Sequence, residues 1–331
     1  MKIAIIALTK GGKQLAERVS TFYTDSFVDR RDLPVFEKLT NLWQQELDAI
    51  ICIMATGIVV RGLSSLCYDK KSDPCVLVLD EKGQFVISLL SGHLGGGNKL
   101  ARELAEYLGG QAVITTASDV TGHTALDLWA RKNRLVVDDS RKLTEKSAKL
   151  VNTGRLTLYS DTEPKSLPED FITVSHPDSA DIIVSDALFQ ETAALILRPC
   201  MLSVGLGCNR GTGVADFQRA VSELFTENNL NLKSIAMFAS IDLKDDEQGL
   251  LDFVSLKGLP IIFYAKEQLN GVAGVSSSAV VYAATGAKGV AEPAALLGAK
   301  TASCQGKLIV RKRKWKDVTA AVATKQIQLV A

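Results

Sequence analysis

The sequence of 331 residues predicts an α/β protein: two α/β domains with mainly parallel sheets, joined by a small α/β middle domain. Three observations lead to this prediction. Short apolar runs of strand length alternate with helical patterns in residues 1–133 and again in residues 199–331. The run Asp48–Met54 is almost continuously apolar, which is typical of a strand buried on both faces of a parallel sheet. Residues 134–198 combine a charged helical pattern with short apolar runs separated by prolines, which indicates a separate middle domain.

The first domain is predicted to contain a regular order of strands and helices. Its strands are expected at Lys2–Leu8, Asp48–Met54, Cys75–Asp80, Phe85–Leu90 and Ala112–Thr116. Its helices are expected at Lys13–Phe22, Val35–Leu47, 58–66, Asn98–Leu108 and, after a loop, within 118–133.

The middle and C-terminal domains follow from the same patterns. In the middle domain we expect a helix at 140–151 and strands at 155–160, 171–175 and 181–186. In the C-terminal domain we expect strands at 201–207, Ser234–Ser240 and Leu259–Tyr264, helices at Val214–Glu227, Glu247–Lys257 and near Ser277–Thr285, and a short helix within 289–299. The runs KLIVRKRKW and DVTAAVA predict a closing hairpin.

Composition excludes several classes of protein. The chain is 47% hydrophobic and 23% charged, as in folded globular proteins, and its net charge of +1 offers no overall field for nucleic acid or an acidic membrane. None of the six cysteines forms a Cys-x-x-Cys pair, which argues against a zinc or iron–sulfur site and fits reduced thiols in the cytoplasm. The apolar runs are too short for a secretion signal or a membrane span. We therefore expect a cytoplasmic protein with no membrane or nucleic-acid partner.

The strongest local signal is the turn SGHLGGGN, residues 91–98, between a strand and a helix. Its glycines let the backbone approach a ligand, and the helix start, with Asn98 expected as N-cap, offers N–H groups to an anion. His93 could transfer a proton or donate a hydrogen bond. In the alternative interpretation, the turn is only a tight connection in which His93 caps or packs.

A second glycine-rich turn, GLGCNRGTG, spans residues 205–213. Its glycine spacing differs from the dinucleotide-binding fingerprint, which disfavours a nucleotide-binding oxidoreductase. Arg210 suits a carboxylate ligand, because the guanidinium group can form paired hydrogen bonds. Cys208 is either a nucleophile or a structural thiol, and the absence of a nearby histidine in the sequence favours the structural role.

Other polar residues have both a functional and a structural interpretation. Alternation along a strand would place Arg311 and Arg313 on one face, where they could bind carboxylates or remain solvated. His123 is expected to cap a helix or line a cleft, whereas His176 is expected in a solvated loop.

The motifs together resemble one family. The stretches KSDPCVLVLDEKGQFVISLLSGHLGGGNKLARELA and VITTASD are similar to the N-terminal part of the CbiG family, the cobalt-precorrin 5A hydrolases. The stretches LSVGLGCNRGT, SIDLKDDEQGLL, GVAEPAALL and LIVRKRKWKDVTAAVA resemble the C-terminal part of that family. The resemblance covers residues from about 48 to 130 and from about 201 to 324.

The resemblance implies an enzyme of anaerobic vitamin B12 biosynthesis. Its substrate would be a cobalt-bearing tetrapyrrole whose δ-lactone is opened with water, with release of a two-carbon fragment as acetaldehyde and formation of cobalt-precorrin 5B. Cobalt would arrive within the substrate, so no cofactor and no protein metal site are expected. Transient contact with neighbouring enzymes of the pathway is expected. A non-catalytic corrinoid-binding or pathway-interaction protein is the alternative.

Residue roles follow from the chemistry of that reaction. Lactone opening needs an acid–base group, for which His93 and Glu292 are the candidates; Glu292 could instead only stabilise its helix start. A cleft between the two α/β domains, with His93 and Arg210 facing it, would suit a large planar ligand. The expected substrate-binding residues are Ser91, Gly92, Gly95, Gly96, Gly97, Asn98, Lys99, Thr56, Gly57, Arg61, Cys208, Arg210, Gly211, Thr212, Arg311 and Arg313.

Overall fold

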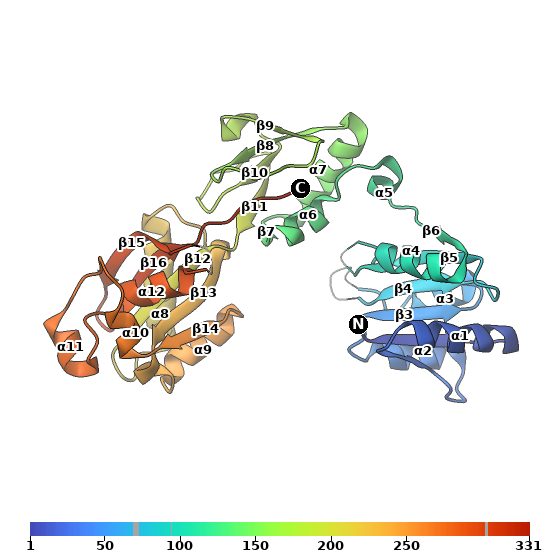
Figure 1. Ribbon diagram of the computed structural model, residues 1–331, viewed down its shortest axis with the longest axis horizontal. Helices are drawn as coiled ribbons and strands as arrows, with labels where there is room; N and C mark the ends of the chain where they lie inside the picture. Colours follow the sequence, from blue (N-terminus) through green and yellow to red (C-terminus); the bar gives the residue numbers. More distant parts are fainter. Residues whose placement is uncertain (69–72, 94, 302–303) are drawn as a thin grey trace. The chain divides into compact units, whose positions relative to one another are not determined.

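The computed structural model describes residues 1–68, 73–93, 95–301 and 304–331 (Figure 1). It divides into two compact units, Met1–Leu128 and Trp129–Ala331. The three sheets of the described chain fall in the three predicted domain ranges to within one residue, although residues 129–133 belong to the second unit. The α/β class with mostly parallel sheets is confirmed.

The first unit is built on a six-stranded sheet of order β2-β1-β3-β4-β5-β6. Its strands are β1 (Ile3–Ala7), β2 (Ser26–Val28), β3 (Ala49–Ile53), β4 (Cys75–Leu79), β5 (Phe85–Leu90) and β6 (Gln111–Val113). Its helices are α1 (Lys10–Phe22), α2 (Val35–Trp43), α3 (Thr56–Leu63), α4 (Gly97–Leu108), α5 (Ala117–Thr121) and α6 (Leu126–Lys132), which continues into the second unit.

Strand direction changes once in this sheet. The strands β1 to β4 are parallel to one another, β5 pairs antiparallel with β4, and β6 runs parallel to β5. Successive side chains of β3 point to opposite faces of the sheet, and helices cover both faces, so its sequence is apolar throughout. Ile51 packs with the residues of α1 and α4 on one face, whereas Ile50 and Cys52 pack with α2 and α3 on the other.

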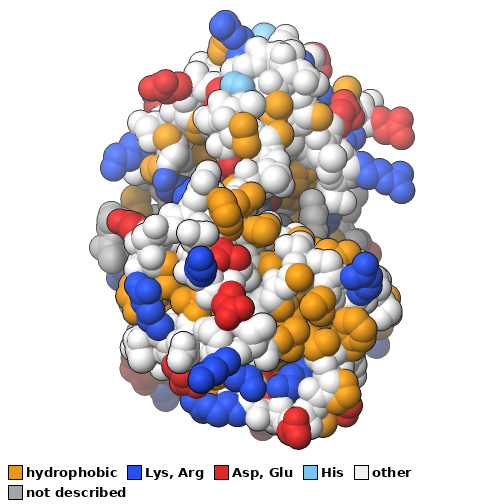
Figure 2. Space-filling view, turned by 90° about the vertical axis from the view of Figure 1, so that its right-hand side faces the viewer, with side chains coloured by type: hydrophobic (Ala, Val, Ile, Leu, Met, Phe, Trp, Pro, Cys, Tyr) orange, Lys and Arg blue, Asp and Glu red, His pale blue; other side chains and the backbone are white. Residues whose placement is uncertain are grey.

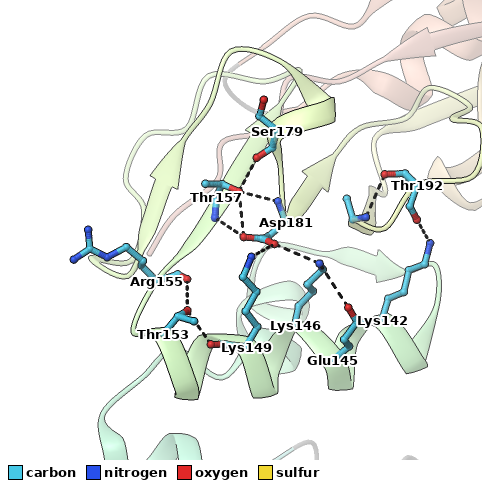
Figure 3. A network of polar contacts seen from close by, with 11 residues as sticks. Lys142, Glu145, Lys146, Lys149, Thr153, Arg155, Thr157, Ser179, Asp181 and Thr192 are labelled. Atoms are coloured by element: carbon cyan, nitrogen blue, oxygen red, sulfur yellow. Dashed lines mark hydrogen bonds and ion pairs between the residues drawn. The ribbon is translucent and has the colours of Figure 1, made fainter.

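The second unit begins with the middle sheet, of order β7-β11-β10-β8-β9. Its elements are β7 (Leu135–Val137), α7 (Ser140–Thr153), β8 (Leu156–Ser160), β9 (Phe171–Thr173), β10 (Ile182–Val184) and β11 (Leu195–Pro199), with a 3-10 turn at Pro177–Ser179. Figure 3 shows how α7 is joined to this sheet: Asp181 accepts hydrogen bonds from Lys146 and Lys149 of the helix, at 3.3 and 2.7 Å, and from the Thr157 N–H. Asp181 and Lys146 are both buried, so this ion pair holds the two elements together.

The third sheet has the order β14-β13-β12-β16-β15. Its strands are β12 (Leu202–Cys208), β13 (Ile235–Ile241), β14 (Ile261–Tyr264), β15 (Lys307–Lys314) and β16 (Val318–Thr324). Its helices are α8 (Val214–Glu227), α9 (Gln248–Lys257), α10 (Lys266–Asn270), α11 (Ala279–Thr285) and α12 (Ala291–Ala299), with 3-10 turns at Leu232–Ser234 and Asp242–Lys244. Helices α8 and α9 cover one face and α12 the other, and the predicted closing hairpin is confirmed as β15 and β16.

The C-terminal tail returns from the third sheet to the middle sheet. Leu329 is fully buried, and its carbonyl accepts from the Lys165 N–H at 3.0 Å. The Val330 carbonyl accepts from Nε1 of Trp129 at 2.9 Å. These contacts join the two sheets of the second unit.

The structure adds elements that the sequence patterns missed. The strands β2, β7 and β11 and the helix α10 have no predicted counterpart, and the helix α5 lies where a loop was expected. Two of these strands have three residues each, which is too short for a periodic pattern to be recognised.

No helix in the described part of the chain is long and apolar enough to cross a membrane. On the face drawn in Figure 2, side chains of both charge signs are interspersed with hydrophobic ones.

Candidate functional site

The glycine turn after β5 folds back on its own backbone. The N–H groups of Gly96, Gly97 and Asn98 donate to the carbonyls of His93, Ser91 and Gly92, at 3.0, 3.3 and 2.8 Å. These are the N–H groups that we expected to cradle an anion. That expectation is wrong for these three groups, because hydrogen bonds within the turn already occupy them.

Glycine is required in this turn for close packing and for backbone conformation. A Cβ at Gly95 would lie 2.6 Å from the Ser91 carbonyl oxygen, and Gly96 has a φ of 80°. Ser91 adopts a φ of 52°, and its hydroxyl donates to the Asp73 carbonyl at 3.1 Å. The turn is therefore a constrained scaffold that fixes the position of His93.

Asn98 does not cap α4. The helix begins at Gly97, with Gly96 at the N-cap, and Asn98 is buried in the first turn. Its side-chain amide donates to Oδ2 of Asp119 at 2.7 Å and to Oγ1 of Thr116 at 3.2 Å. Asn98 therefore supports a neighbouring carboxylate.

His93 lies between two carboxylates. Its Nε2 is 2.8 Å from Oδ2 of Asp119, and its Nδ1 is 3.5 Å from Oδ2 of Asp127. The Ser118 hydroxyl is 3.4 Å from the same Nε2. The side chains of His93, Asp119 and Asp127 are 20%, 15% and 17% exposed, so the cluster is shielded but reachable from solvent.

The two carboxylates favour the protonated imidazole. The hydrogen bond to Asp127 is the main factor that raises the pKa of His93; burial opposes it, and Asp119 reinforces it. The contact with Asp119 is shorter, but Asp119 also accepts from Asn98 and from Arg102, so its charge is shared. A neutral imidazole would turn a lone pair toward one of the carboxylates, whereas an imidazolium donates to both.

The same contacts keep both carboxyl groups ionised. Burial would raise the pKa of Asp119, but the hydrogen bonds from Arg102 and His93 outweigh burial and lower it. Burial likewise opposes ionisation of Asp127, and the contact with His93 again lowers the pKa.

Asp119, Asp127 and Arg102 were not among the residues expected at the site. Asp119 ends the VITTASD motif, and seven residues of mixed polarity separate it from Asp127, so neither shows a periodic or spacing signal. Strand β6 runs parallel to β5 and carries the chain to the edge of the sheet where the glycine turn lies. Recognising these partners required the strand pairing.

Thr56, Gly57 and Arg61 lie at the other edge of the same sheet. Thr56 begins α3 just after β3, and the last residues of β3 pair with the end of β4. Leu90, just before the glycine turn, pairs instead with Val76 near the start of β4. Three residue steps along β4, from Val76 to Leu79, separate the two pairings, which corresponds to about 10 Å. A cavity of about 420 Å³ opens beside Thr56, lined mainly by apolar side chains together with Asp80 and Glu81. The structure therefore does not bring these residues together with His93.

Lys99 and the second glycine turn are engaged within their own parts of the chain. Lys99 is exposed and lies 3.7 Å from Glu103. The Gly211 N–H donates to Glu247, the Thr212 hydroxyl donates to the Asn209 carbonyl, and Arg210 contacts Asp246 and Glu247. These hydrogen-bonding groups already have partners of the same unit.

Cys208 lies beside this turn as a half-buried thiol. Burial raises the pKa of Cys208 to about 11, so the thiol stays protonated at neutral pH and is a poor nucleophile. The environment matches the structural role that the sequence favoured.

Glu292 serves as an acceptor for its own chain. It is buried, and its carboxylate accepts from the N–H and hydroxyl of Ser276, at 2.6 and 3.2 Å, and from the Lys312 N–H at 2.9 Å. Burial opposes ionisation, but these donors outweigh it and lower the pKa of Glu292. The contacts give Glu292 a structural function and supply no support for a catalytic one.

Arg311 and Arg313 do not share a face of β15. A bulge between Val310 and Arg313 breaks the alternation on which that prediction rested. Arg313 lies 3.6 Å from Glu223, also pairs with Glu227 of the same helix, α8, and lies over the ring of Trp315. Arg311 is exposed, and its charge acts on Glu292 of α12, which covers the opposite face. The expectation of a shared cationic face is therefore wrong.

The described residues contain no group of three or more His, Cys, Asp or Glu side chains placed to hold a metal ion. The polar cluster around His93 instead has the composition of a proton-transfer site: one imidazole, two carboxylates, and an arginine and an amide that hold one of them.

Comparison with known proteins gives consistent matches along the chain. Residues 37–119 match the family described as cobalamin synthesis G N-terminal, and residues 202–323 match cobalamin synthesis G C-terminus. The chain is 32% identical to cobalt-precorrin-5A hydrolase of Priestia megaterium, over 97% of this chain and 94% of that protein. It is 33% identical to cobalt-precorrin-5A hydrolase of Salmonella typhimurium, over 81% and 83%. It is 30% identical to a protein of Methanocaldococcus jannaschii named probable cobalt-precorrin-5A hydrolase, over 99% and 100%.

Proposed function

Because the chain belongs to the CbiG family, we propose that His93 is the acid–base group with which it hydrolyses cobalt-precorrin 5A. The chain is a hydrolase, and its substrate is a cobalt-bearing tetrapyrrole. The observation that carries the assignment of His93 is the placement of carboxylates at both imidazole nitrogens.

The reaction requires a proton to be given and then taken. Water adds to the lactone carbonyl, and the ring oxygen must be protonated as the carbon–oxygen bond breaks. The hydroxyl group so formed must then lose its proton as the carbon–carbon bond breaks: the two-carbon fragment leaves as acetaldehyde, and the electron pair of the broken bond stays on the conjugated macrocycle. A single group of ordinary pKa near neutrality can serve both steps at the same oxygen.

His93 has the surroundings for the first step. Asp127 and Asp119 raise the pKa of its imidazole and so favour the protonated form. On substrate binding, the lactone oxygen replaces Asp119 as the acceptor at Nε2, while Asp127 keeps its contact with Nδ1. Asp119 remains held by Asn98 and Arg102, so its displacement leaves no unpaired carboxylate.

The second step follows from the position of Asp127. Once Nε2 has given up its proton, the Nδ1–H donates to Asp127, which fixes the neutral tautomer and leaves the Nε2 lone pair facing the same oxygen. His93 then takes the hydroxyl proton during acetaldehyde release. Asp127 acts through His93, so it is a positioning residue.

The cobalt ion belongs to the substrate in this proposal, and the chain uses no resident cofactor. The reaction takes place in the cytoplasm, where the six free cysteines of the chain would remain reduced.

His93→Gln tests the assignment. With cobalt-precorrin 5A as substrate, this variant should release acetaldehyde about 10²- to 10⁴-fold more slowly than the wild-type chain, because general acid–base catalysis contributes that range. His176→Gln is the matched control, since His176 is exposed in the middle domain. Full activity of a folded His93→Gln variant would refute the role of His93. Corrinoid binding without acetaldehyde from the wild-type chain would instead favour a non-catalytic binding protein.

A further inference from the structure

Helix α11, Ala279–Thr285, is an apolar helix left on the surface of the third sheet's domain. Its sequence AVVYAAT carries no charge, and none of its seven residues is buried. Val280 is 79% exposed and Tyr282 is 57% exposed. Single exposed apolar residues are common, but five exposed apolar residues on one seven-residue helix form a patch of the kind that binds another molecule.

The helix is attached along one side only. Val281 is the residue that packs partly on the cluster around Ala239 and Leu269. Successive helical residues turn by about 100°, so Ala279 and Ala283 point away from Val281, with Tyr282 and Val280 on either side of them. We call the exposed residues Ala279, Val280, Tyr282, Ala283 and Ala284 the α11 patch. The two outermost residues of the patch are alanines, and their small side chains let a flat ring approach the helix closely.

Cations lie at both ends of α11. The Lys288 carbonyl accepts from Ser278 at the start of the helix, and the Lys288 side chain is exposed. At the other end, an added Cβ at Gly286 would lie 3.1 Å from Cδ of Lys266. Lys266 is 55% exposed and lies 4.0 Å from Glu267, so its charge is only weakly paired.

A third cation is connected to the base of α11. Glu292 accepts from Ser276, just before the helix, and from the N–H of Lys312 in β15. The charge of the exposed Arg311 lowers the pKa of the same carboxylate. The apolar α11 patch thus has lysines at its ends, and the charge of Arg311 acts on the carboxylate that binds Ser276, just before the helix.

We propose that the α11 patch binds one face of the tetrapyrrole ring, with Lys266, Lys288 and Arg311 pairing with its peripheral carboxylates. The ligand this surface fits is planar and apolar at its centre and anionic at its edge. This inference rests on the proposed function for the identity of the ligand. It assigns substrate binding to a helix that does not contribute to proton transfer.

Binding can be measured without turnover. Cobyrinic acid, a stable cobalt corrinoid with carboxylate side chains, is titrated into the full-length chain and followed by absorbance. Tyr282→Ser and Val280→Ser should each raise the dissociation constant about tenfold, because each removes an apolar side chain from the interface. Leu256→Ser is the matched control: Leu256 lies on α9 of the same domain, is 64% exposed and should leave binding unchanged.

The cationic part of the proposal has its own comparison. Lys266→Gln and Lys288→Gln should each weaken binding of cobyrinic acid about two- to fivefold at low salt, as expected for exposed charge pairs. Neither substitution should change binding of cobinamide, a corrinoid whose side chains are amides. Equal losses for both corrinoids would overturn the carboxylate pairing.

Turnover separates this inference from the proposed function. With cobalt-precorrin 5A, the Tyr282→Ser and Val280→Ser variants should raise KM about tenfold and retain kcat, since binding is weakened without loss of the proton-transfer groups. An active wild-type chain whose α11 variants bind and turn over normally would overturn the inference alone. Absence of acetaldehyde from the wild-type chain would refute the function, while the cobyrinic acid titration would still decide the α11 patch. Sedimentation that shows wild-type dimers, monomeric α11 variants and unchanged corrinoid binding would assign the patch to a second copy of the chain instead.

Discussion

Asp127→Asn removes the carboxylate that faces Nδ1 of His93 and preserves the shape of the side chain. A hydrogen bond between charged groups contributes about 1.5–3 kcal/mol. The Nδ1···Oδ2 distance is 3.5 Å and the two side chains are 20% and 17% exposed, so both length and solvent weaken the contact. We therefore expect the free energy of unfolding of the first unit to fall by the lower value, about 1.5 kcal/mol, where both groups are charged in the wild type.

The pH range of this effect follows from the direction of each pKa shift. Asp127 raises the pKa of His93, so this stabilisation is fully present below the ordinary histidine pKa of about 6.5 and is lost as the pH rises through the raised value. The pKa of Asp127 is lowered, so its contribution is present above the ordinary carboxyl pKa of about 3.9 and is lost as the pH falls through the lowered value. The free energies of unfolding of the wild type and Asp127→Asn should differ most between pH values of about 3.9 and 6.5.

Two measurements check this prediction. The chain has three histidines, so NMR titration of their Cε1–H signals, identified with His123→Gln and His176→Gln, reports each pKa separately. Native-state hydrogen exchange of the α4 amides reports unfolding of the first unit. In Asp127→Asn the pKa of His93 should fall, whereas the exposed-site control Asp178→Asn should leave it unchanged. An unchanged His93 titration in Asp127→Asn would refute the positioning role of Asp127.

Three further substitutions test the supporting structure. Glu292→Gln should retain acetaldehyde release but lose about 1–3 kcal/mol of stability, because an amide cannot accept from Ser276 and its other donors as a carboxylate does; a folded variant without turnover would restore its catalytic assignment. Asp181→Asn should cost about 3 kcal/mol by leaving Lys146 buried without its carboxylate. Burial would raise the pKa of Asp181, but the hydrogen bond from Lys149 helps to lower it. In urea denaturation, the stability lost in Asp181→Asn should therefore be largest above the ordinary carboxyl pKa and should disappear as the pH falls through the lowered pKa of Asp181. A loss of stability that does not depend on pH would contradict this reasoning. Leu329→Ala should cost about 2–5 kcal/mol in calorimetry, because the side chain is fully buried, and unchanged unfolding would show that the tail does not stabilise the unit.

Periodicity predicted the longer elements well. Helix α8 spans Val214–Glu227 as expected, and the apolar run around β3 is buried on both faces. These patterns record burial, which repeats along a helix or strand and can be read locally. The bulge in β15 could not be read in this way, since it depends on pairing with β16.

The candidate site was predicted in part. The sequence indicated the glycine turn and His93, and the contacts of both are consistent with a prepared site. It also indicated free N–H groups for an anion and an N-cap at Asn98, but the N–H groups of Gly96, Gly97 and Asn98 bond within the turn, and Gly96 is the N-cap. The turn closes on its own carbonyls because its glycines permit that conformation, and a residue pattern alone does not reveal which acceptor an N–H group finds.

Local chemistry by itself determined that a constrained glycine turn would present His93 between a strand and a helix. Tertiary structure decided what surrounds it: β6, parallel to β5, carries the chain back toward His93, where Asp119 and Asp127 follow. It also placed Thr56 at the opposite edge, because β5 runs antiparallel to β4. Strand direction depends on hydrogen bonding between distant segments, and for that reason neither outcome could be read from the residues of the turn.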